Sequence, residues 1–501
     1  MRSLLPTGAL IVAAAGFLLA DAPQFAQADV QVQLGDLLFS EGRYTEAADA
    51  YRRALGSEAV GARAGVGLVL TALRLGHFDV AYKQAATVRE RYPDVADVAA
   101  AHGEALWAYG LFEDAEAAYD AALAVEVNQP RAHHGRARSL AARSRLDEAL
   151  AEAREALRLN PREAEFYYTA GAIHLRRHNF DEAALAFRSY VNLLPNRDVS
   201  EKAAWVRAQI RFLDSFKGKR PFDIESAADD RIWRVPIRIE REKVLVRGRV
   251  NGGPQQDFVL DTGAEQTVIS RDAARRRGVI PITYIQSAGV GDVGLRGLQV
   301  GRLDRFEIGD LKIRHVPCLI KNPPLSGLPA REPESFSPLA LGLSMRLDYA
   351  RRELSMTRRL GSERYEAELP LRMHRLAMVG GRVNGTHRAP FVVDTGGEVI
   401  SISQSTAGVI QPEPAFRRIP LKVYGTSGWD KDAFLMPNVD LEFSTIRFNR
   451  IPVVVLNLQA PSVLLGFQLG GIVGHKFLSQ YRLSIDLDRS VVGLDRNLRT
   501  Q

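Results

Sequence analysis

A short stretch of sequence occurs twice in this chain of 501 residues. The first copy, Phe258–Ser270, reads Phe-Val-Leu-Asp-Thr-Gly-Ala-Glu-Gln-Thr-Val-Ile-Ser, and the second, Phe391–Ser403, reads Phe-Val-Val-Asp-Thr-Gly-Gly-Glu-Val-Ile-Ser-Ile-Ser. Each copy is an apolar run that stops at Asp-Thr-Gly and then resumes as a β-rich segment. The two aspartates, Asp261 and Asp394, are 133 residues apart. We expect them to face each other in one site.

The residues around the two copies repeat at the same offset. Gly248–Gly252 recurs as Gly381–Gly385, and an Asn-Gly pair next to an apolar run predicts a tight hairpin turn. We therefore expect two β lobes related by duplication, over residues 231–362 and 363–497. Further matches at similar but not identical offsets pair Val316–Cys318 with Ile451–Val453, Leu339–Gly342 with Gly471–Gly474, and Arg346–Tyr349 with Leu483–Asp486.

The first half of the chain carries a different repeat, with a period of 34 residues. Small side chains at fixed positions let two helices cross closely, and each helix pair buries its apolar face only by stacking on the next pair. The expected turns between paired helices begin at Gly42, Gly76, Gly110, Ser144 and His178. Mostly small residues stand seven positions before these turns, at Gly35, Val69, Gly103, Ala137 and Gly171.

This pattern resembles the tetratricopeptide repeat (TPR), and the resemblance covers about a third of the chain. It implies an all-α solenoid over residues 29–216, in which Ser200–Phe216 is expected to form a terminal capping helix. Such solenoids usually offer a concave groove, so we expect the groove to bind a protein partner. The alternative is a solenoid that only spaces or stabilises its neighbour.

The length and the composition agree with more than one domain. A chain of 501 residues exceeds one ordinary core, so two or three domains are expected. Lys217–Asp230 is polar and contains Gly and Pro, which predicts a linker over residues 217–230. Expected strands follow this linker at Arg234–Ile239, Val244–Val250, Phe258–Leu260, Arg305–Ile308 and Val316–Ile320.

The net charge of +7 comes mostly from arginine. No Lys/Arg cluster is interleaved with aromatic residues, so nucleic-acid binding is not expected, whereas a loose attraction to anionic membrane surfaces stays open. The one cysteine, Cys318, lies between apolar residues and is expected to be a buried structural thiol. A single cysteine excludes an intrachain disulfide, and we expect neither a metal nor a cofactor.

Residues 1–28 are typical of a secretory signal peptide. Arg2 supplies a positive start, and Leu10–Ala20 is an apolar run too short to span a bilayer comfortably. Ala26–Ala28 then fits a small-x-small cleavage site. We expect an exported protein, periplasmic or secreted. The alternative is a membrane-anchored protein whose N-terminal segment stays uncleaved.

The order of features within each lobe resembles the retropepsin-like and pepsin-like aspartic proteases. That order is a hairpin, an apolar strand, Asp-Thr-Gly, a Gly-containing hairpin, and two apolar residues plus Gly near the end of the lobe. Asp261–Val268 is particularly close to the retroviral form. The resemblance covers about half the chain and implies a multidomain protein: an all-α TPR solenoid followed by an all-β bilobal acid-protease-like domain. It makes Asp261 and Asp394 the expected catalytic pair.

The resemblance also implies how the two loops are supported. Thr262 and Thr395 are expected to exchange hydrogen bonds across the lobe interface. Gly263 and Gly396 are expected to let each backbone turn sharply and approach the partner loop. The segments expected to pack behind the loops are Ala340–Gly342 and Ile472–Gly474.

The implied chemistry needs two carboxylates. Like charges about 3 Å apart cannot both ionise, so the pair shares one proton. The ionised member takes a proton from a bound water while the protonated member donates to the scissile carbonyl oxygen, without a covalent intermediate.

Two Gly-rich segments, Ala288–Gly294 and Tyr424–Trp429, are candidates for flaps that close over a substrate. The first also matches the Gly-x-Gly-x-x-Gly pattern of dinucleotide sites, but no helix pattern follows it and no βαβ unit surrounds it. The predicted substrate-binding and flap residues are Ala264, Glu265, Gly289, Gly291, Gly397, Glu398, Gly425 and Thr426.

Some positions depart from the pepsin-like pattern. Glu265 and Glu398 stand where pepsin-like enzymes usually have Ser or Thr, and Gly397 is unusual. The retroviral type carries an acid at this position, so we expect Glu265 to pair with an arginine or to bind peptide backbone.

Three functions are consistent with these features. The first is an exported aspartic endopeptidase, monomeric with an intrachain site, whose solenoid recruits a peptide or protein substrate or a protein partner. The second is a non-catalytic adaptor that binds peptides with a degenerate protease fold. In the third, each lobe dimerises with another chain.

Overall fold

The computed structural model describes residues 27–225, 231–291, 294–321, 334–410, 418–425 and 427–497. Most of the predicted signal peptide, part of the predicted linker and Thr426 lie outside these residues. The chain forms two compact units, Met1–Gly135 and Arg136–Gln501, which divide within helix α7 (Pro130–Ala142). Among the described residues, no helix is both long enough and apolar enough to cross a membrane.

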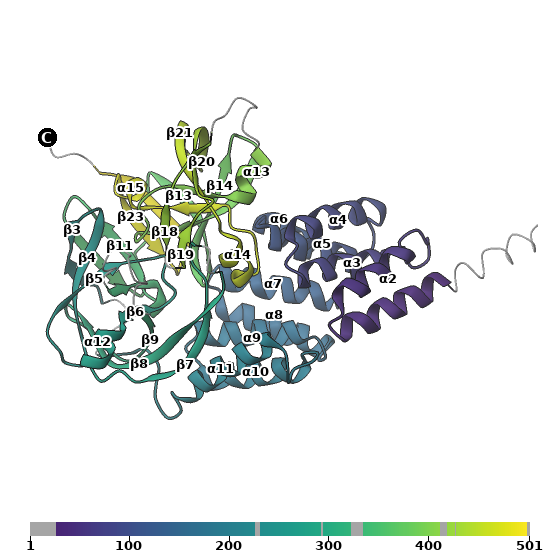
Figure 1. The fold of residues 1–501 in the computed structure, drawn as a ribbon, viewed down its shortest axis with the longest axis horizontal. Coiled ribbons are helices and arrows are strands. Elements are labelled where there is room, and N and C mark those ends of the chain that lie inside the picture. Colours follow the sequence, from purple (N-terminus) through teal and green to yellow (C-terminus); the bar gives the residue numbers. More distant parts are fainter. Residues whose placement is uncertain are drawn as a thin grey trace, which may run out of the picture. The chain divides into compact units, whose positions relative to one another are not determined.

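Paired helices make up the first half of the chain, as the period of 34 residues predicts (Figure 1). In the first unit these are the helical residues 27–40, α2 (Tyr44–Ala54), α3 (Gly61–Arg74), α4 (Phe78–Arg91), α5 (Ala96–Tyr109), α6 (Phe112–Val125) and the start of α7. The second unit continues with α8 (Leu146–Leu159), α9 (Ala164–Arg176), α10 (Phe180–Leu193) and α11 (Glu201–Asp214).

The repeated turn has a backbone cause. Each of its five first residues has a left-handed conformation, with φ of +78° at Gly42, +72° at Gly76, +91° at Gly110, +57° at Ser144 and +60° at His178. Glycine adopts this conformation without a steric cost, whereas serine and histidine do not. The fourth and fifth turns therefore hold a side chain in a strained position, and His178 reappears below.

The small residues before each turn have a packing cause. A β-carbon added at Gly35 would lie 2.5 Å from the Tyr51 ring, and one at Gly171 would lie 2.6 Å from the Phe187 ring. The second repeat has a larger residue, Val69, and an alanine, Ala85, in place of the aromatic ring. A larger side chain in one helix of a repeat is thus matched by a smaller one in the other helix, as close packing requires.

The second half of the chain is built mainly of strands. Lobe one contains β2 (Trp233–Pro236), β3 (Arg238–Glu240), β4 (Lys243–Val250), β5 (Gln256–Leu260), β6 (Thr267–Ser270), α12 (Arg271–Arg276), β7 (Pro281–Ser287), β8 (Arg296–Ile308), β9 (Leu311–Lys321), β10 (Glu334–Phe336), the 3-10 helix η1 (Leu339–Leu341), β11 (Ser344–Asp348) and β12 (Glu353–Thr357). A short strand, β1 (Asp223–Ile224), precedes them and pairs with β9.

Lobe two repeats this series. It contains β13 (Ala367–His374), β14 (Leu376–Val383), β15 (His387–Val393), β16 (Ser401–Ser403), α13 (Gln404–Ile410), β17 (Ile419–Pro420), β18 (Val423–Gly425), β19 (Gly428–Asp430), β20 (Phe434–Phe443), β21 (Ile446–Leu456), α14 (Gln459–Leu465), β22 (Gly471–Val473), α15 (His475–Leu478), β23 (Tyr481–Asp486) and β24 (Val491–Arg496).

The sheet topology confirms the duplication. Lobe one has the strand order β9-β6-β10-β5-β4-β8, and lobe two has the equivalent order β21-β16-β22-β15-β14-β20. In both lobes the strand that precedes Asp-Thr-Gly pairs in parallel with a later short strand, β5 with β10 and β15 with β22. The two Asn-Gly turns also match, with left-handed φ at Asn251 and Asn384.

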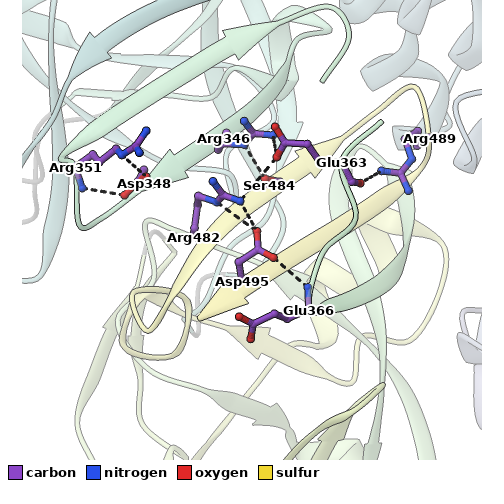
Figure 2. Close-up of polar contacts among 9 residues, drawn as sticks. All are labelled: Arg346, Asp348, Arg351, Glu363, Glu366, Arg482, Ser484, Arg489 and Asp495. Atoms are coloured by element: carbon purple, nitrogen blue, oxygen red, sulfur yellow. Dashed lines mark hydrogen bonds and ion pairs between the residues drawn. The ribbon is translucent and has the colours of Figure 1, made fainter. Parts of the chain in front are cut away.

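One sheet joins the two lobes. Its order is β2-β12-β11-β23-β24-β13, so each lobe contributes three strands, and Leu347 of β11 lies opposite Leu483 of β23 at the centre. Polar contacts cover this sheet (Figure 2): Arg482 pairs with Asp495 at 2.9 Å, and Arg346 donates to Ser484 Oγ of the other lobe at 3.3 Å. The lobes therefore form one continuous core rather than two separate ones.

The solenoid continues into this core. Val300 and partly buried Ile285 and Leu319 of lobe one pack in one apolar cluster with residues of α10 and α11. Ser200 caps α11, because its side chain accepts the amide of Ala203. The predicted capping helix thus forms, and it packs against strands. The boundaries predicted for the solenoid, the linker and the two lobes stay predictions.

Candidate active site

The two aspartates follow equivalent strands. Asp261 comes directly after β5 and Asp394 directly after β15. The amide of Asp261 donates to Phe336 O of β10 at 2.9 Å, and the amide of Asp394 donates to Val473 O of β22 at 3.0 Å. Each aspartate therefore leaves its sheet at the same place relative to a parallel neighbour.

One predicted support is wrong. Ile472–Gly474 lies behind the second loop as expected, but Ala340–Gly342 does not lie behind the first. Glu334–Phe336 takes that place, and Leu339–Leu341 forms η1 beyond it. An apolar-apolar-Gly match is short and occurs by chance, whereas the pairing with the strand that leads to the aspartate defines the true equivalent.

The two threonines connect the loops reciprocally. The Thr262 amide donates to Thr395 Oγ1 at 3.1 Å, and the Thr395 amide donates to Thr262 Oγ1 at 3.0 Å. Each hydroxyl also donates across the interface, from Thr262 to Val393 O at 2.6 Å and from Thr395 to Leu260 O at 2.7 Å. Both side chains are buried. The position of each loop is thus fixed by the other.

The glycines let each loop reach the opposite carboxyl group. A β-carbon added at Gly263 would lie 2.6 Å from Asp394 Cγ, and one at Gly396 would lie 2.7 Å from Asp261 Cγ. No side chain fits at either position without a shift. The two carboxyl groups consequently lie within one small volume, as the repeated tripeptide predicts.

This closeness changes the ionisation of both aspartates. Burial and the neighbouring Asp394 carboxylate raise the pKa of Asp261 to about 7, and Lys321 and Ser335 oppose that shift. Burial also raises the pKa of Asp394, and the amides of Gly397 and Gly396 oppose it. Because the groups are coupled, the protons belong to the pair. The raised pKa values favour a state in which the pair retains a shared proton, and acid–base hydrolysis needs that state.

The surroundings of the two carboxyl groups differ. Asp394 Oδ1 accepts the Gly396 amide at 2.8 Å, and Lys243 donates to Gly396 O beside it. A hydrogen bond from an amide favours the charged form of a carboxyl group. The negative charge is therefore better stabilised on Asp394 than on Asp261.

Two hairpins, one from each lobe, contact each other at their tips. The β7–β8 hairpin and the β18–β19 hairpin correspond to the predicted flaps, although residues 292, 293 and 426 lie outside the described part. The Ser427 amide donates to Val290 O at 2.9 Å, and the Gly289 amide donates to Ser427 Oγ at 3.0 Å. A β-carbon at Gly291 would lie 2.5 Å from Ser427 O. The flap tips therefore touch through glycine backbone.

The two glutamates that follow the tripeptides have different partners. Glu265 forms an ion pair with Arg375, at 2.8 Å to Nε and 2.7 Å to Nη2, which is the first of the two expected arrangements. Glu398 accepts the Lys476 amide with its backbone oxygen at 2.9 Å. Ala264 and Gly397 lie in the loops, where the Ala264 amide donates to Asp261 O at 3.2 Å and Gly397 O accepts the His475 amide at 2.7 Å.

The structure also brings in residues that the sequence did not single out. These are Ser335, Lys243, Arg375, Ser427 and, from the solenoid, Trp205 of α11. Of these, only Ser427 lies in a segment with a recognisable signal, the Gly-rich run of the second flap. The others lie on strands, a turn and a helix that are remote in sequence, and none of these four residues belongs to a repeated motif.

Helix α11 lies against the first flap. The Trp205 ring comes within 2.9 Å of a β-carbon position at Gly297 of β8, and Arg211 Nη2 donates to Thr283 Oγ1 of β7 at 3.5 Å. At the flap base, Arg302 Nη1 donates to Ser215 O at 2.8 Å. The outer face of this hairpin is therefore packed by the end of the solenoid.

Comparisons with known proteins agree with this architecture. The model of the family described as "Aspartyl protease" matches residues 246–344 and 379–469. Tetratricopeptide repeat models match residues 66–133 and 134–198, and residues 28–59. The chain thus contains an N-terminal TPR region and a C-terminal aspartyl protease domain in two parts.

Several solved structures match part of this chain. TTC0263 of Thermus thermophilus, a thermophilic TPR protein, is 22% identical over 38% of this chain and 99% of its own, with a TM-score of 0.31. PilF of Pseudomonas aeruginosa is 14% identical over 39% of this chain and 88% of its own, with a TM-score of 0.29. Yeast Tom70 is 19% identical over 40% of this chain and 43% of its own, with a TM-score of 0.30. No curated protein matches the chain.

Proposed function

We propose that this protein is an aspartic endopeptidase that hydrolyses peptide bonds with water activated between Asp261 and Asp394. One observation carries the proposal: the Thr262 and Thr395 hydrogen bonds join two Asp-Thr-Gly loops so that each glycine touches the opposite carboxyl group. A binding module has no need for two carboxyl groups at this separation, because burying like charges together costs free energy.

The proposed reaction uses the shared proton of the pair. The ionised carboxylate takes a proton from the water, and the protonated carboxyl group donates to the scissile carbonyl oxygen. The Gly396 amide favours Asp394 as the ionised member, so Asp261 holds the shared proton in the resting state. In this proposal the two flaps, whose tips contact each other, cover the bound substrate and exclude bulk water.

The TPR region supplies the proposed recruitment of a substrate or partner protein. Its support is the TPR match and the packing of α11 on the first flap, which joins the solenoid to the part of the site that a substrate must displace. We further propose export of the mature chain, on the predicted signal peptide. N-terminal sequencing of the protein recovered from cell fractions tests cleavage after Ala28 and separates it from an uncleaved anchor.

The decisive test is digestion of a peptide library by the whole chain, with products identified by mass spectrometry. Asp261→Asn and Asp394→Asn are each expected to lower the cleavage rate by at least about a thousandfold, because each removes one of the two proton-transfer groups. An inhibitor that mimics the tetrahedral transition state should block the unaltered enzyme. The surface variant Asp272→Asn is the matched control and should cleave normally. Cleavage that persists in both single dyad variants would refute the proposal.

A second candidate function is a non-catalytic peptide-binding adaptor. The observation that favours it is the direct hydrogen bonding of the flap tips through Val290, Gly289 and Ser427. Binding of library peptides without any product, in the unaltered chain and in Asp261→Asn alike, identifies this function. Sedimentation of the whole chain distinguishes the proposed monomer from lobes that pair between chains.

A further inference from the structure

A basic pocket lies away from the aspartates, where the end of the solenoid meets lobe one. Its volume is about 440 Å³, and it lies between the α9–α10 turn, the segment before β1 and the end of η1. Three arginines line it, Arg177, Arg220 and Arg358, together with His178. Among the described residues that line the pocket there is no aspartate or glutamate.

The charge balance of the pocket favours an anion. Arg177 pairs with Asp147 outside the lining, so part of its charge is already compensated. Arg220 and Arg358 are exposed at the pocket, and both act on His178, whose pKa is lowered to about 4 by burial and by these two cations. The positive charges of Arg220 and Arg358 thus act on the same small volume. A bound anion there would be stabilised by both of them.

The inner wall offers further donors. His178 lies at the fifth left-handed turn, and its ring packs against the Phe222 ring at a tilt of 36°, with centroids 4.4 Å apart. This ring contact holds the strained residue against the pocket. Asn179 is the N-cap of the α10 helix, but its side chain does not cap the helix. Asn179 itself lines the pocket, so its side-chain amide adds a donor to those of the arginines and the histidine.

The position of the pocket gives an anion two elements to join. Leu341 and Gly342 form its other wall, and a β-carbon position at Gly342 lies 3.5 Å from His178 Cε1. Residues Leu339–Leu341 form η1, which follows β10, the strand that receives the Asp261 amide. A ligand here bridges the last helical repeat and lobe one.

We propose that this pocket binds a phosphate group. Guanidinium groups match phosphate oxygens with paired hydrogen bonds, and a dianion balances the charges of the lining better than a single carboxylate does. The volume has room for free phosphate with its waters or for the head of a larger molecule. Free phosphate and a phospholipid head group share this chemistry, and the experiment separates them.

The test uses the whole chain and measures thermal unfolding and calorimetric binding with sodium phosphate, against sodium chloride at equal ionic strength. Phosphate is expected to raise Tm by several degrees and to bind one to one. The variant Arg220→Gln/Arg358→Gln is expected to weaken phosphate binding at least about tenfold. Arg276→Gln, an exposed arginine of α12 outside this pocket, is the matched control and should bind like the unaltered chain.

A parallel arm measures co-sedimentation with phosphatidylglycerol vesicles, against phosphatidylcholine vesicles. Binding to the anionic vesicles that depends on Arg220 and Arg358, with no response to free phosphate, supports the phosphate group and identifies a lipid as its source. The single variants Arg220→Gln and Arg358→Gln replace the double variant if that variant does not fold. Phosphate no more effective than chloride, together with vesicle binding unchanged in the arginine variants, overturns the proposal.

Discussion

The two lobes have the same topology, but only some of their contacts are equivalent. They agree where one copy touches the other: the threonine hydrogen bonds, the glycine approach to the opposite carboxyl group, and the central pair of strands β11 and β23. They differ where each copy touches something else. The duplication is thus retained at the interface that assembles the site and has diverged around it.

The clearest divergence lies beside the two glutamates. Glu265 of lobe one is paired by Arg375 of lobe two, whereas the position equivalent to Arg375 in lobe one is Glu242, which pairs with exposed Lys476. Both residues have a left-handed backbone, so the turn is the same and only the charge is reversed. The charge at this turn is therefore reversed between the two lobes.

The flaps differ in how they are held. Flap one, β7–β8, rests on helix α11 through Trp205 and Arg211. Flap two, β18–β19, is short and holds its own aromatic pair, with the Tyr424 and Trp429 rings 5.2 Å apart. The first flap is therefore linked to the solenoid through α11.

The largest expected effect tests where the lobes agree. Thr262→Val and Thr395→Val each remove a buried hydroxyl that accepts one amide and donates to one carbonyl across the interface. Each change leaves two buried groups without partners, at a cost of about 2–5 kcal/mol. Because the contacts are reciprocal, we expect equal losses in the free energy of unfolding, measured by urea denaturation.

A double-mutant cycle supplies the control for the threonines. The double variant should lose clearly less than the sum of the two single variants, because both hydroxyls hold the same two loops together and the second change acts on loops that the first has already loosened. Thr386→Val, at an exposed turn of lobe two, should change stability little. Unequal losses from the single variants would contradict the equivalence of the two loops. Additive losses in the double variant would contradict their mutual dependence.

A smaller effect tests how the two aspartates differ. The pKa of Asp261 is raised to about 7, above its ordinary value in the unfolded chain, so the folded state binds more protons between these two pH values. Stability therefore falls as pH rises through this window, and the loss is complete above about pH 7. Asp261→Asn removes this penalty, so the variant should be more stable than the unaltered chain at pH 8, by about 1–3 kcal/mol.

The comparison at two pH values makes this result specific. At pH 4 the gain should nearly vanish, because Asp261 is then protonated in the folded chain and about half protonated in the unfolded chain. Asp394→Asn should gain less at pH 8, since the Gly396 amide loses a charged acceptor. Equal gains from both variants at pH 8 would contradict the assignment of the negative charge to Asp394.

Much of the fold and of the candidate site could be predicted from the sequence, because the motifs that define them are repeated. The repeated Asp-Thr-Gly gives the aspartates, threonines and glycines, and the two periods give the solenoid and the duplicated lobes. The repeated Asn-Gly gives two hairpin turns. Each of these signals is local, and each is read twice or more at a constant offset.

The other features of the site depend on contacts between segments that are remote in sequence and contain no repeated motif. Arg375 reaches Glu265 from the other lobe, and its equivalent residue has the opposite charge. The strand behind the first loop, Glu334–Phe336, shares no pattern with Gly471–Val473, so the chance match at Ala340–Gly342 is the stronger signal in the sequence. Nothing in the sequence of α11 indicates that its partner is a flap.

The smallest expected effect tests the link between the solenoid and the first flap. Trp205→Ala removes the ring that packs on Gly297 and leaves the candidate dyad untouched. We expect flap one to open more readily, so that amide hydrogen exchange rises in β7 and β8 but not in β18 and β19. If the enzyme cleaves peptides, kcat/KM should fall about three- to tenfold, which corresponds to about 1 kcal/mol. Trp205→Phe retains a ring and should restore most of the protection. Equal exchange in both flaps after Trp205→Ala would show that the solenoid does not act on one flap alone.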